Sequence, residues 1–364
     1  MLRDSVESDT GQRRLWFTAG FSVVAFVAAF AACLALGHPK VGLAAGLVAM
    51  FAAVGAGVAP RGMTLQIGIP AGVAVLATIP LVLAADRRPW VAAAVTAAVM
   101  VLGSLTQADA PVGTVVGFMG STAYVMGVAS RSIHDVSAGE AALAVAVGGT
   151  AAAAAVAGLM AWRAYGAHEG ISWVPPKVPR VPGNGWVRWW RAVTTALRDW
   201  RHDPYVRLAV RRLVVLPPMV AGLVAWGNDD ALFGLLAAFA VTQPTLHDTE
   251  DRTVAQITGT LLACAGGVAA GLLLPTWAVI PLGILGIAFG LAFIRRNQVI
   301  AAAGTTAFAL AGAGLYEPLE TLAPLRLAAA VAGVAIAVLA TLVIRPPRRR
   351  QPVAASEPEG GTTS

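Results

Sequence analysis

The chain has 364 residues, of which 57% are hydrophobic and only 12% are charged, and its formal net charge is +7. A soluble protein carries roughly 25% charged residues, so this composition argues against a soluble globular enzyme and for a membrane protein. The positive charge does not indicate a nucleic-acid partner, because its distribution follows the membrane topology predicted below.

Apolar segments of membrane-spanning length follow one another from Leu15 to Ile344. The ionisable residues lie almost entirely between these segments, and none occurs from Thr253 to Ile294. A charge at mid-membrane costs at least about 2.5–3.5 kcal/mol, which explains the exclusion. We therefore predict an all-α polytopic membrane protein with about twelve transmembrane helices, at residues 15–36, 41–59, 63–85, 89–106, 111–130, 140–162, 208–227, 231–246, 254–274, 277–294, 297–315 and 325–344.

Basic residues orient these predicted helices. If both termini are cytoplasmic, the cytoplasmic segments hold 21 of the 26 lysines and arginines, as the positive-inside rule requires. The sequence thus predicts a multi-pass protein of the cell (cytoplasmic) membrane. Residues 86–88, with two arginines on the outer side, are the largest exception. Segment 231–246 is short, and Pro244 near its end favours a half-helix.

The predicted helices divide into two repeats of six, 15–162 and 208–344. Gln66 and Gln256, and likewise Gly113 and Gly304, are separated by 190 or 191 residues. Six helices in each half give both halves the same orientation, which makes this a parallel repeat. The alternative is coincidence in a low-complexity composition.

Between the repeats lies a polar linker, 163–207, which opens with a proline-rich and therefore semi-rigid stretch. Trp and Arg then recur at helical spacing, with Trp186, Trp190, Val193, Leu197 and Trp200 on one side. Such a helix suits the lipid headgroup layer, so we predict a cytoplasmic amphipathic helix that joins the two repeats. A regulatory or partner-binding helix is the alternative.

The two ends of the chain complete the predicted domain organisation. Residues 1–14 form a cytoplasmic N-terminus. Residues 345–364 are basic and proline-rich, and then rich in Gly, Ser and Thr, so a disordered cytoplasmic tail is expected.

Sequence motifs for enzymatic chemistry are absent. The chain has no G-x-x-x-x-G-K-[ST], no G-x-S-x-G and no H-E-x-x-H. Its two cysteines, Cys33 and Cys264, lie inside predicted helices and have no metal-ligand spacing. We therefore expect a protein that is not an enzyme and has no cofactor or metal. The polar cluster 247–252 indicates a solvated loop and helix cap more than a catalytic site.

Polar residues within or beside the predicted helices mark a candidate substrate path. An amide or hydroxyl in hydrocarbon needs a partner, so these side chains should face the bundle interior or a wet cavity. Arginines at the cytoplasmic mouth would attract organic anions. The competing interpretation is that Thr and Gln only join helices, each contributing about 0.6 kcal/mol. The candidate path residues are Arg61, Gln66, Gln243, Arg252, Gln256, Thr258, Thr260, Arg295 and Arg296.

Three of these residues carry the most specific site hypothesis. Arg252, Gln256 and Thr260 are four residues apart, so they share one helix face. Arg252 also lies at the positively polarised start of that helix, which favours an anion. In the alternative, Arg252 pairs with Asp248 or Glu250 and only fixes the topology.

The segment 228–274 carries a family resemblance. An apolar span ends in Thr242-Gln243-Pro244, a polar loop leads to Arg252, and Ile257-Thr258-Gly259-Thr260 opens a glycine-rich helix. This pattern resembles the fusaric acid resistance-like (aromatic acid exporter) family of integral membrane transporters, with a fainter echo at 37–79. The sequence departs from the family in two ways. Gln256 stands where a basic residue is common, and the large cytoplasmic domains of many members are missing.

The resemblance implies a secondary transporter that exports small organic anions, including aromatic carboxylic acids, across the cytoplasmic membrane. Alternating access between the two halves follows from the repeat. A coupling proton would have to reside on a group at a helix end, such as Asp109, Glu140, His247 or Asp251. A passive anion channel and a non-transporting membrane scaffold or assembly subunit are the alternatives. The expected partners are the lipid bilayer and an organic anion, and the sequence leaves open the substrate, the coupling ion and a homo-oligomer.

Overall fold

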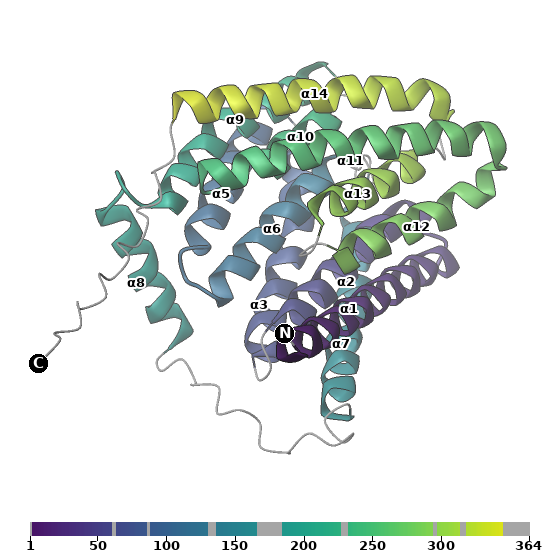
Figure 1. Ribbon diagram of the computed structural model, residues 1–364, viewed down its shortest axis with the longest axis horizontal. Helices are drawn as coiled ribbons and strands as arrows, with labels where there is room; N and C mark the ends of the chain where they lie inside the picture. Colours follow the sequence, from purple (N-terminus) through teal and green to yellow (C-terminus); the bar gives the residue numbers. More distant parts are fainter. Residues whose placement is uncertain are drawn as a thin grey trace, which may run out of the picture.

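The computed structural model describes residues 2–59, 63–85, 88–129, 136–165, 184–226, 232–293, 297–313 and 318–344. Within these ranges every regular element is a helix, and Figure 1 shows them gathered into one bundle. The all-α prediction is therefore confirmed for the described residues. The linker stretch 166–183 and the tail 345–364 lie outside them.

Seven helices form the first half. The turn between the first two is closed by Gly37, whose φ of 83° suits a residue without a Cβ. Two of the helices begin with a proline, which is favourable because the first helical N–H has no partner. The helices are α1 (Leu2–Ala35), α2 (Pro39–Val58), α3 (Thr64–Leu76), α4 (Thr78–Ala85), α5 (Pro89–Thr106), α6 (Val112–Ala129) and α7 (Ala138–Tyr165).

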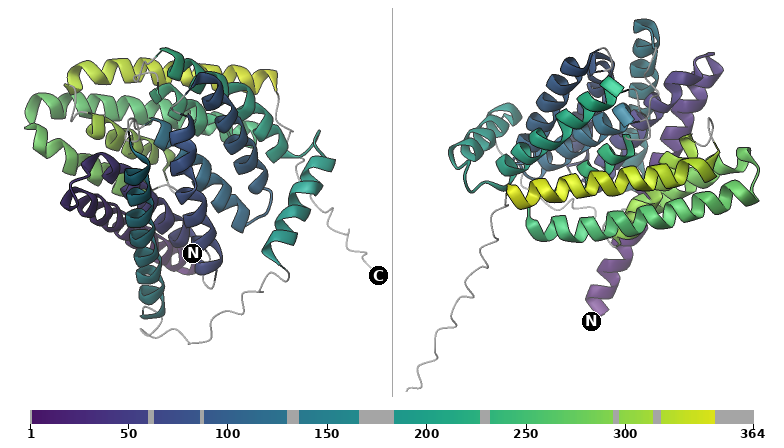
Figure 2. Two further views of the ribbon diagram at one scale, coloured as in Figure 1. Left: turned by 180° about the vertical axis from the view of Figure 1, so that it is seen from behind. Right: turned by 90° about the horizontal axis from the view of Figure 1, so that it is seen from above.

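The linker helix and six further helices follow. Thr245 caps the long helix α11, because its hydroxyl accepts from the N–H of Asp248. The helices are α8 (Gly185–Arg198), α9 (Pro204–Trp226), α10 (Leu232–Val241), α11 (Leu246–Leu273), α12 (Thr276–Phe293), α13 (Gln298–Ala313) and α14 (Leu319–Val343). α11 and α14 run side by side along one face of the bundle (Figure 2).

Eight helices in the described residues are long and apolar enough to cross a membrane, and three further apolar helices are shorter. α10 has only 10 residues, and the chain from Thr242 to Pro244 is not helical. The predicted short eighth segment is thus a short helix that ends before Pro244. These helices indicate a multi-pass membrane protein, and the count of twelve spans stays a prediction.

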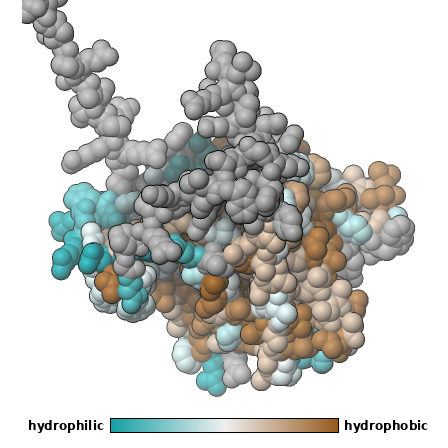
Figure 3. Space-filling view, turned by 90° about the horizontal axis from the view of Figure 1, so that it is seen from below, coloured by the Kyte–Doolittle hydropathy of each residue, from teal (hydrophilic) through white to brown (hydrophobic). Residues whose placement is uncertain are grey.

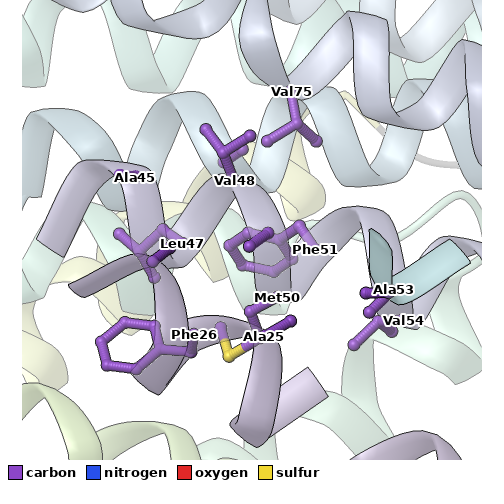
Figure 4. Close-up of a cluster of buried hydrophobic side chains, with 14 of the residues drawn as sticks. Ala25, Phe26, Ala45, Leu47, Val48, Met50, Phe51, Ala53, Val54 and Val75 are labelled. Carbon is purple, nitrogen blue, oxygen red and sulfur yellow. The ribbon is translucent and has the colours of Figure 1, made fainter. Parts of the chain in front are cut away.

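The core of the first half is built around α2, whose residues are almost all buried from Val41 to Val58. Figure 4 shows this core, in which Phe26 of α1 lies beside α2 residues such as Leu47 and Met50. A β-carbon at Gly46 would lie 2.6 Å from the ring of Phe26. The G-x-x-x-G spacing of Gly42 and Gly46 therefore serves packing between α1 and α2, because only glycine leaves room for this close approach.

The outer surface agrees with a lipid environment. Figure 3 shows one face of the molecule on which hydrophobic residues cover most of the described area, while hydrophilic residues gather at one side. Large apolar side chains such as Leu273 of α11 and Val343 of α14 are exposed. In water these side chains would form an aggregation-prone patch, whereas in a bilayer they contact acyl chains.

The linker helix α8 stands at the side of the bundle (Figures 1 and 2) and is docked on the end of α5. Nε of Arg188 donates to the buried carboxylate of Asp109 at 2.9 Å, and Nε1 of Trp189 donates to Oγ1 of Thr106 at 3.2 Å. Val193 and Ala196 are buried in the same contact. The contact places α8 and the turn 107–111 on the same side of the membrane, as the predicted topology requires.

The structure corrects one detail of the amphipathic-helix prediction. Val193 does not share the outward face of the tryptophans but is buried against Leu105 and Val206. Trp186 is 66% exposed and Trp190 55% exposed, and the two rings stack at 6.4 Å. α8 therefore has two apolar faces, one for the bundle and one with tryptophans that is available to the lipid headgroup layer.

The topology can be tested by labelling single cysteines from outside the cell. In a background without Cys33 and Cys264, cysteines at Ser8, Thr195 and Ser356 should remain unlabelled by a membrane-impermeant thiol reagent in intact cells. All three should label after permeabilisation, because the basic segments are expected on the cytoplasmic side. Labelling of any one of them in sealed cells would contradict the predicted orientation.

Candidate functional site

Three of the four predicted path residues of α11 lie on one face of the helix. Nε2 of Gln256 lies 3.4 Å from Oγ1 of Thr260, one turn further along the helix, and Arg252 is half-buried one turn before. Thr260 is buried, whereas Thr258 is exposed on another side of the helix. Arg252, Gln256 and Thr260 therefore share one face, as predicted, and Thr258 does not belong to it. The predicted place of Arg252 at the start of the helix is wrong, because the cap at Thr245 starts α11 at Leu246 and puts Arg252 in the second turn, after Asp248.

The remaining predicted path residues do not lie on the α11 face. Nε2 of Gln243 donates to the carbonyl oxygen of Ala240 at 2.7 Å, so this amide caps the end of α10. Gln66 is exposed near the start of α3. The other three, Arg61, Arg295 and Arg296, lie outside the described residues.

The structure places a buried pair of arginines at the end of α10. Arg211 and Arg212 lie in α9 and are 0% and 1% exposed. Nη2 of Arg211 donates to the carbonyl oxygen of Pro244 at 3.0 Å, and Nη2 of Arg212 lies 3.4 Å from that of Thr242. The two guanidinium groups therefore meet the polar segment between α10 and α11.

Arg212 also reaches the first half of the chain. Its Nη1 lies 3.4 Å from Oγ of Ser104 in the last turn of α5, and its guanidinium carbon lies 4.4 Å from the ring centre of Phe239. Phe239 in turn stacks with Phe118 of α6 at 6.4 Å. The group thus sits where α5, α9 and α10 meet, between an aromatic ring and two polar oxygens.

Some donors of this pair remain without an acceptor. Within the described part of the chain, Nη1 of Arg211 and Nε of Arg212 are buried and have no hydrogen-bond partner. A buried donor left unpaired costs about 1–3 kcal/mol, and more when the group is charged. Buried donors of this kind in a folded protein call for an explanation, such as a role in ligand binding.

Further buried hydroxyl groups continue along α5 and α6. Oγ1 of Thr96 and the hydroxyl of Tyr124 are 2.8 Å apart, and both residues are fully buried. Between this pair and Ser104 lies Ser121, whose Oγ would be 2.0 Å from a β-carbon at Gly103 and has no partner among the described residues. Polar groups thus line the α5–α6 contact from its end toward its middle.

Sequence reasoning did not single out the arginine pair. Arg211 and Arg212 fall inside the predicted span 208–227, and the topology prediction counts them only among the 21 basic residues on the cytoplasmic side. Arg326 of α14, at the start of the predicted span 325–344, is likewise buried, and its guanidinium carbon lies 3.9 Å from the ring centre of Phe233. The available signal was position, because an arginine within a predicted span is by default a functional candidate.

Comparison with known families bears on the second half. The family described as fusaric acid resistance protein-like matches residues 218–340. The predicted family resemblance is confirmed over this segment. Neither a curated protein nor a solved structure matches the chain.

The fusaric acid resistance protein-like segment covers the end of α9, all of α10 to α13 and most of α14. It therefore includes the predicted face of α11 and the polar stretch from Thr242 to Pro244. Arg211 and Arg212 lie just before it. The buried pair contacts the matched segment at two carbonyl groups but is itself outside the match.

Proposed function

We propose that the protein is a secondary exporter that moves small organic anions across the cytoplasmic membrane by alternating access. The match of residues 218–340 to the resistance family carries this proposal, because it supports a membrane protein of the exporter or resistance type. The anionic substrate is inferred from the arginines on the predicted cytoplasmic side, such as Arg211, Arg212 and Arg252. Of the acids on that side, Asp109 is paired with Arg188 and Asp248 accepts from the cap residue Thr245. Aromatic carboxylates are the first candidates, from the family resemblance.

The helix neighbours support two related halves. α2 packs on α7 as α10 packs on α14, and α3 packs on α6 as α11 packs on α13. Between the halves, α5 packs on α9 as α12 packs on α1. In each case the fourth span of one half contacts the first span of the other, as expected for two parallel repeats around an axis along the membrane normal. Rocking about these two contacts is the proposed alternating motion.

The carboxylates named as carriers of a coupling proton have structural partners. Asp109 is paired with Arg188 of α8. Glu140 accepts from the N–H and the hydroxyl of Ser137 at 2.9 and 3.0 Å, which is the arrangement of a helix capping box. These two groups therefore favour structural roles, and proton coupling stays a proposal without an assigned carrier.

The hydrogen bonds of the threonines support a structural role for these residues and not a role in a substrate path. The hydroxyls of Thr242, Thr249 and Thr253 each donate to the carbonyl four residues earlier in the chain, at 2.7 to 2.8 Å. A hydroxyl satisfied in this way needs no neighbouring helix or cavity. The amides and guanidinium groups are therefore better candidates for substrate contact than the threonines.

The α11 face gives the first test of export. We expect Arg252→Gln and, separately, Gln256→Leu to abolish most export of organic anions, because each removes a donor from the proposed entry along the face of α11. The measurement is extracellular metabolite profiling of cells that express each variant, with Leu261→Ala, an exposed α11 change, as control. If both variants accumulate to the parental level and export at the parental rate, this face of α11 is not part of the substrate path.

A second measurement separates the proposed exporter from the alternatives. Reconstituted into proteoliposomes with an imposed proton gradient, an exporter accumulates the anion against its own gradient, whereas a channel only equilibrates it. A scaffold or assembly subunit does neither. If the anion only equilibrates and never accumulates under any imposed ion gradient, the protein is a channel and not an exporter.

A further inference from the structure

The charge around Arg211 and Arg212 is not balanced by the described protein groups. The guanidinium groups form no ion pair with a carboxylate in the part of the chain that the structure describes. Their acceptors are all neutral: the carbonyl groups of Thr242 and Pro244 after α10, the carbonyl group of Arg207 in α9 and the hydroxyl of Ser104. The end of α10 adds a helix dipole worth about half a negative charge. Two positive charges therefore face about half a negative one, and a surplus of positive charge remains.

A purely structural role explains only part of this arrangement. Arginines that cap the carbonyl groups of Thr242 and Pro244 stabilise the interrupted backbone between α10 and α11, which would otherwise be unsatisfied in hydrocarbon. Each arginine serves one of these two carbonyl groups, and neutral amide donors could do the same without the two positive charges. The N–H groups of Nη1 of Arg211 and Nε of Arg212 take no part in the cap.

We infer that Arg211 and Arg212 form a recognition site for a small carboxylate anion at the junction of α5, α9 and α10. A carboxylate would accept from Nη1 of Arg211 and Nε of Arg212, the two N–H groups that lack a partner. Guanidinium groups match the planar geometry of a carboxylate and bind it through charge-assisted hydrogen bonds. The added negative charge would also offset the repulsion between the two neighbouring cations.

The position of the pair links anion binding to the two halves of the chain. Arg212 belongs to the second half, and its contact with Ser104 crosses to the first half through the α5–α9 packing. An anion that draws the guanidinium away from this 3.4 Å contact would weaken the link between the halves. This inference rests on the proposed exporter, for which it supplies the binding site and its coupling to the rocking motion.

Binding to the purified full-length protein tests the site directly. Titration calorimetry with benzoate, against benzamide as the neutral counterpart, should show binding of benzoate alone. Arg211→Gln and Arg212→Gln should each weaken benzoate binding by at least about tenfold, the loss expected for one charge-assisted contact. Arg212→Lys should weaken it less, because the charge remains while the planar fork is lost. The control is Arg198→Gln, which removes an exposed arginine of α8.

A structural cap would give a different result. In that case the glutamine variants lower the unfolding temperature but leave the benzoate Kd unchanged, and this outcome overturns the inference. Equal binding of benzoate and benzamide by the parental protein also overturns it. If a glutamine variant does not fold, Arg211→Lys and Arg212→Lys carry the test, and an unchanged Kd in both contradicts the site.

The outcomes for the site and for the exporter are distinguishable. If the parental protein exports organic anions and both lysine variants export at the parental rate with an unchanged Kd, the exporter stands and the site is rejected. If the arginine variants lose benzoate binding but the parental protein exports no organic anion, the site stands and the exporter is rejected.

Discussion

Replacing Gly333 with alanine is expected to prevent most of the protein from accumulating in a folded form. A β-carbon at Gly333 in α14 would lie 2.0 Å from the carbonyl oxygen of Gly234 in α10. The nearest atoms are the carbonyl group and Cα of Gly234, which belong to the backbone of α10, so no flexible side chain can move aside. Overpacking of this kind costs about 1–3 kcal/mol or more, and here the two helices must separate. Small residues at such crossings are what allows helix backbones to approach in lipid.

The matched control is Gly266→Ala in α11, where a β-carbon meets nothing within 4 Å. This change should be neutral or slightly stabilising, because alanine favours a helix over glycine by about 1 kcal/mol. Fluorescence-detected size-exclusion chromatography of detergent extracts measures both variants. A monodisperse Gly333→Ala protein at the parental level would show that α10 and α14 do not pack as described.

Removing the carboxylate of Asp109 is expected to release α8 from the bundle. The side chain of Asp109 is 7% exposed and pairs with Nε of Arg188 at 2.9 Å. Breaking a buried ion pair from one side costs about 3–5 kcal/mol, and the partial exposure of Arg188 reduces that figure. Asp109→Ala should therefore make the linker around α8 markedly more sensitive to limited proteolysis, while the helices of the bundle stay resistant.

The control for this prediction is Asp199→Ala, because Asp199 pairs with His202 in an exposed pair at the other end of α8. It should leave the proteolysis pattern unchanged, since exposed pairs contribute little. The double variant Asp109→Ala with Arg188→Ala should be less sensitive than Asp109→Ala alone if the two residues interact directly. Additive effects of the two changes would argue against a specific pair.

Much of the fold follows from the sequence because the bilayer imposes a strong constraint. Helix ranges could be predicted from runs without charge, and α12 lies within such a run. The docking of α8 could not, because Trp189 and Val193 have the same apolar character as the exposed Trp190. Helical spacing gives the residues that share a face, but it does not give the element that this face contacts.

One part of the candidate site could be predicted from the sequence and the other part could not. The shared face of Arg252, Gln256 and Thr260 depends only on spacing within one helix, so it was predictable. The burial of Arg211 and Arg212 depends on α5 and on the end of α10, which are distant in sequence. An arginine within the first turns of a span can extend its side chain to the headgroup layer, so its position alone did not distinguish a surface charge from a buried one.

The contact between α5 and α9 also bears on the order in which the chain is made. α5 enters the membrane well before α9 is synthesised, so the side of α5 that carries Ser104 first faces lipid or a transient partner. α8 emerges just before α9 and docks on Thr106 and Asp109 at the end of α5. If α8 docks as soon as it emerges, it would hold the start of α9 beside α5 while the second half is still being inserted, and α9 would meet its partner at high local concentration.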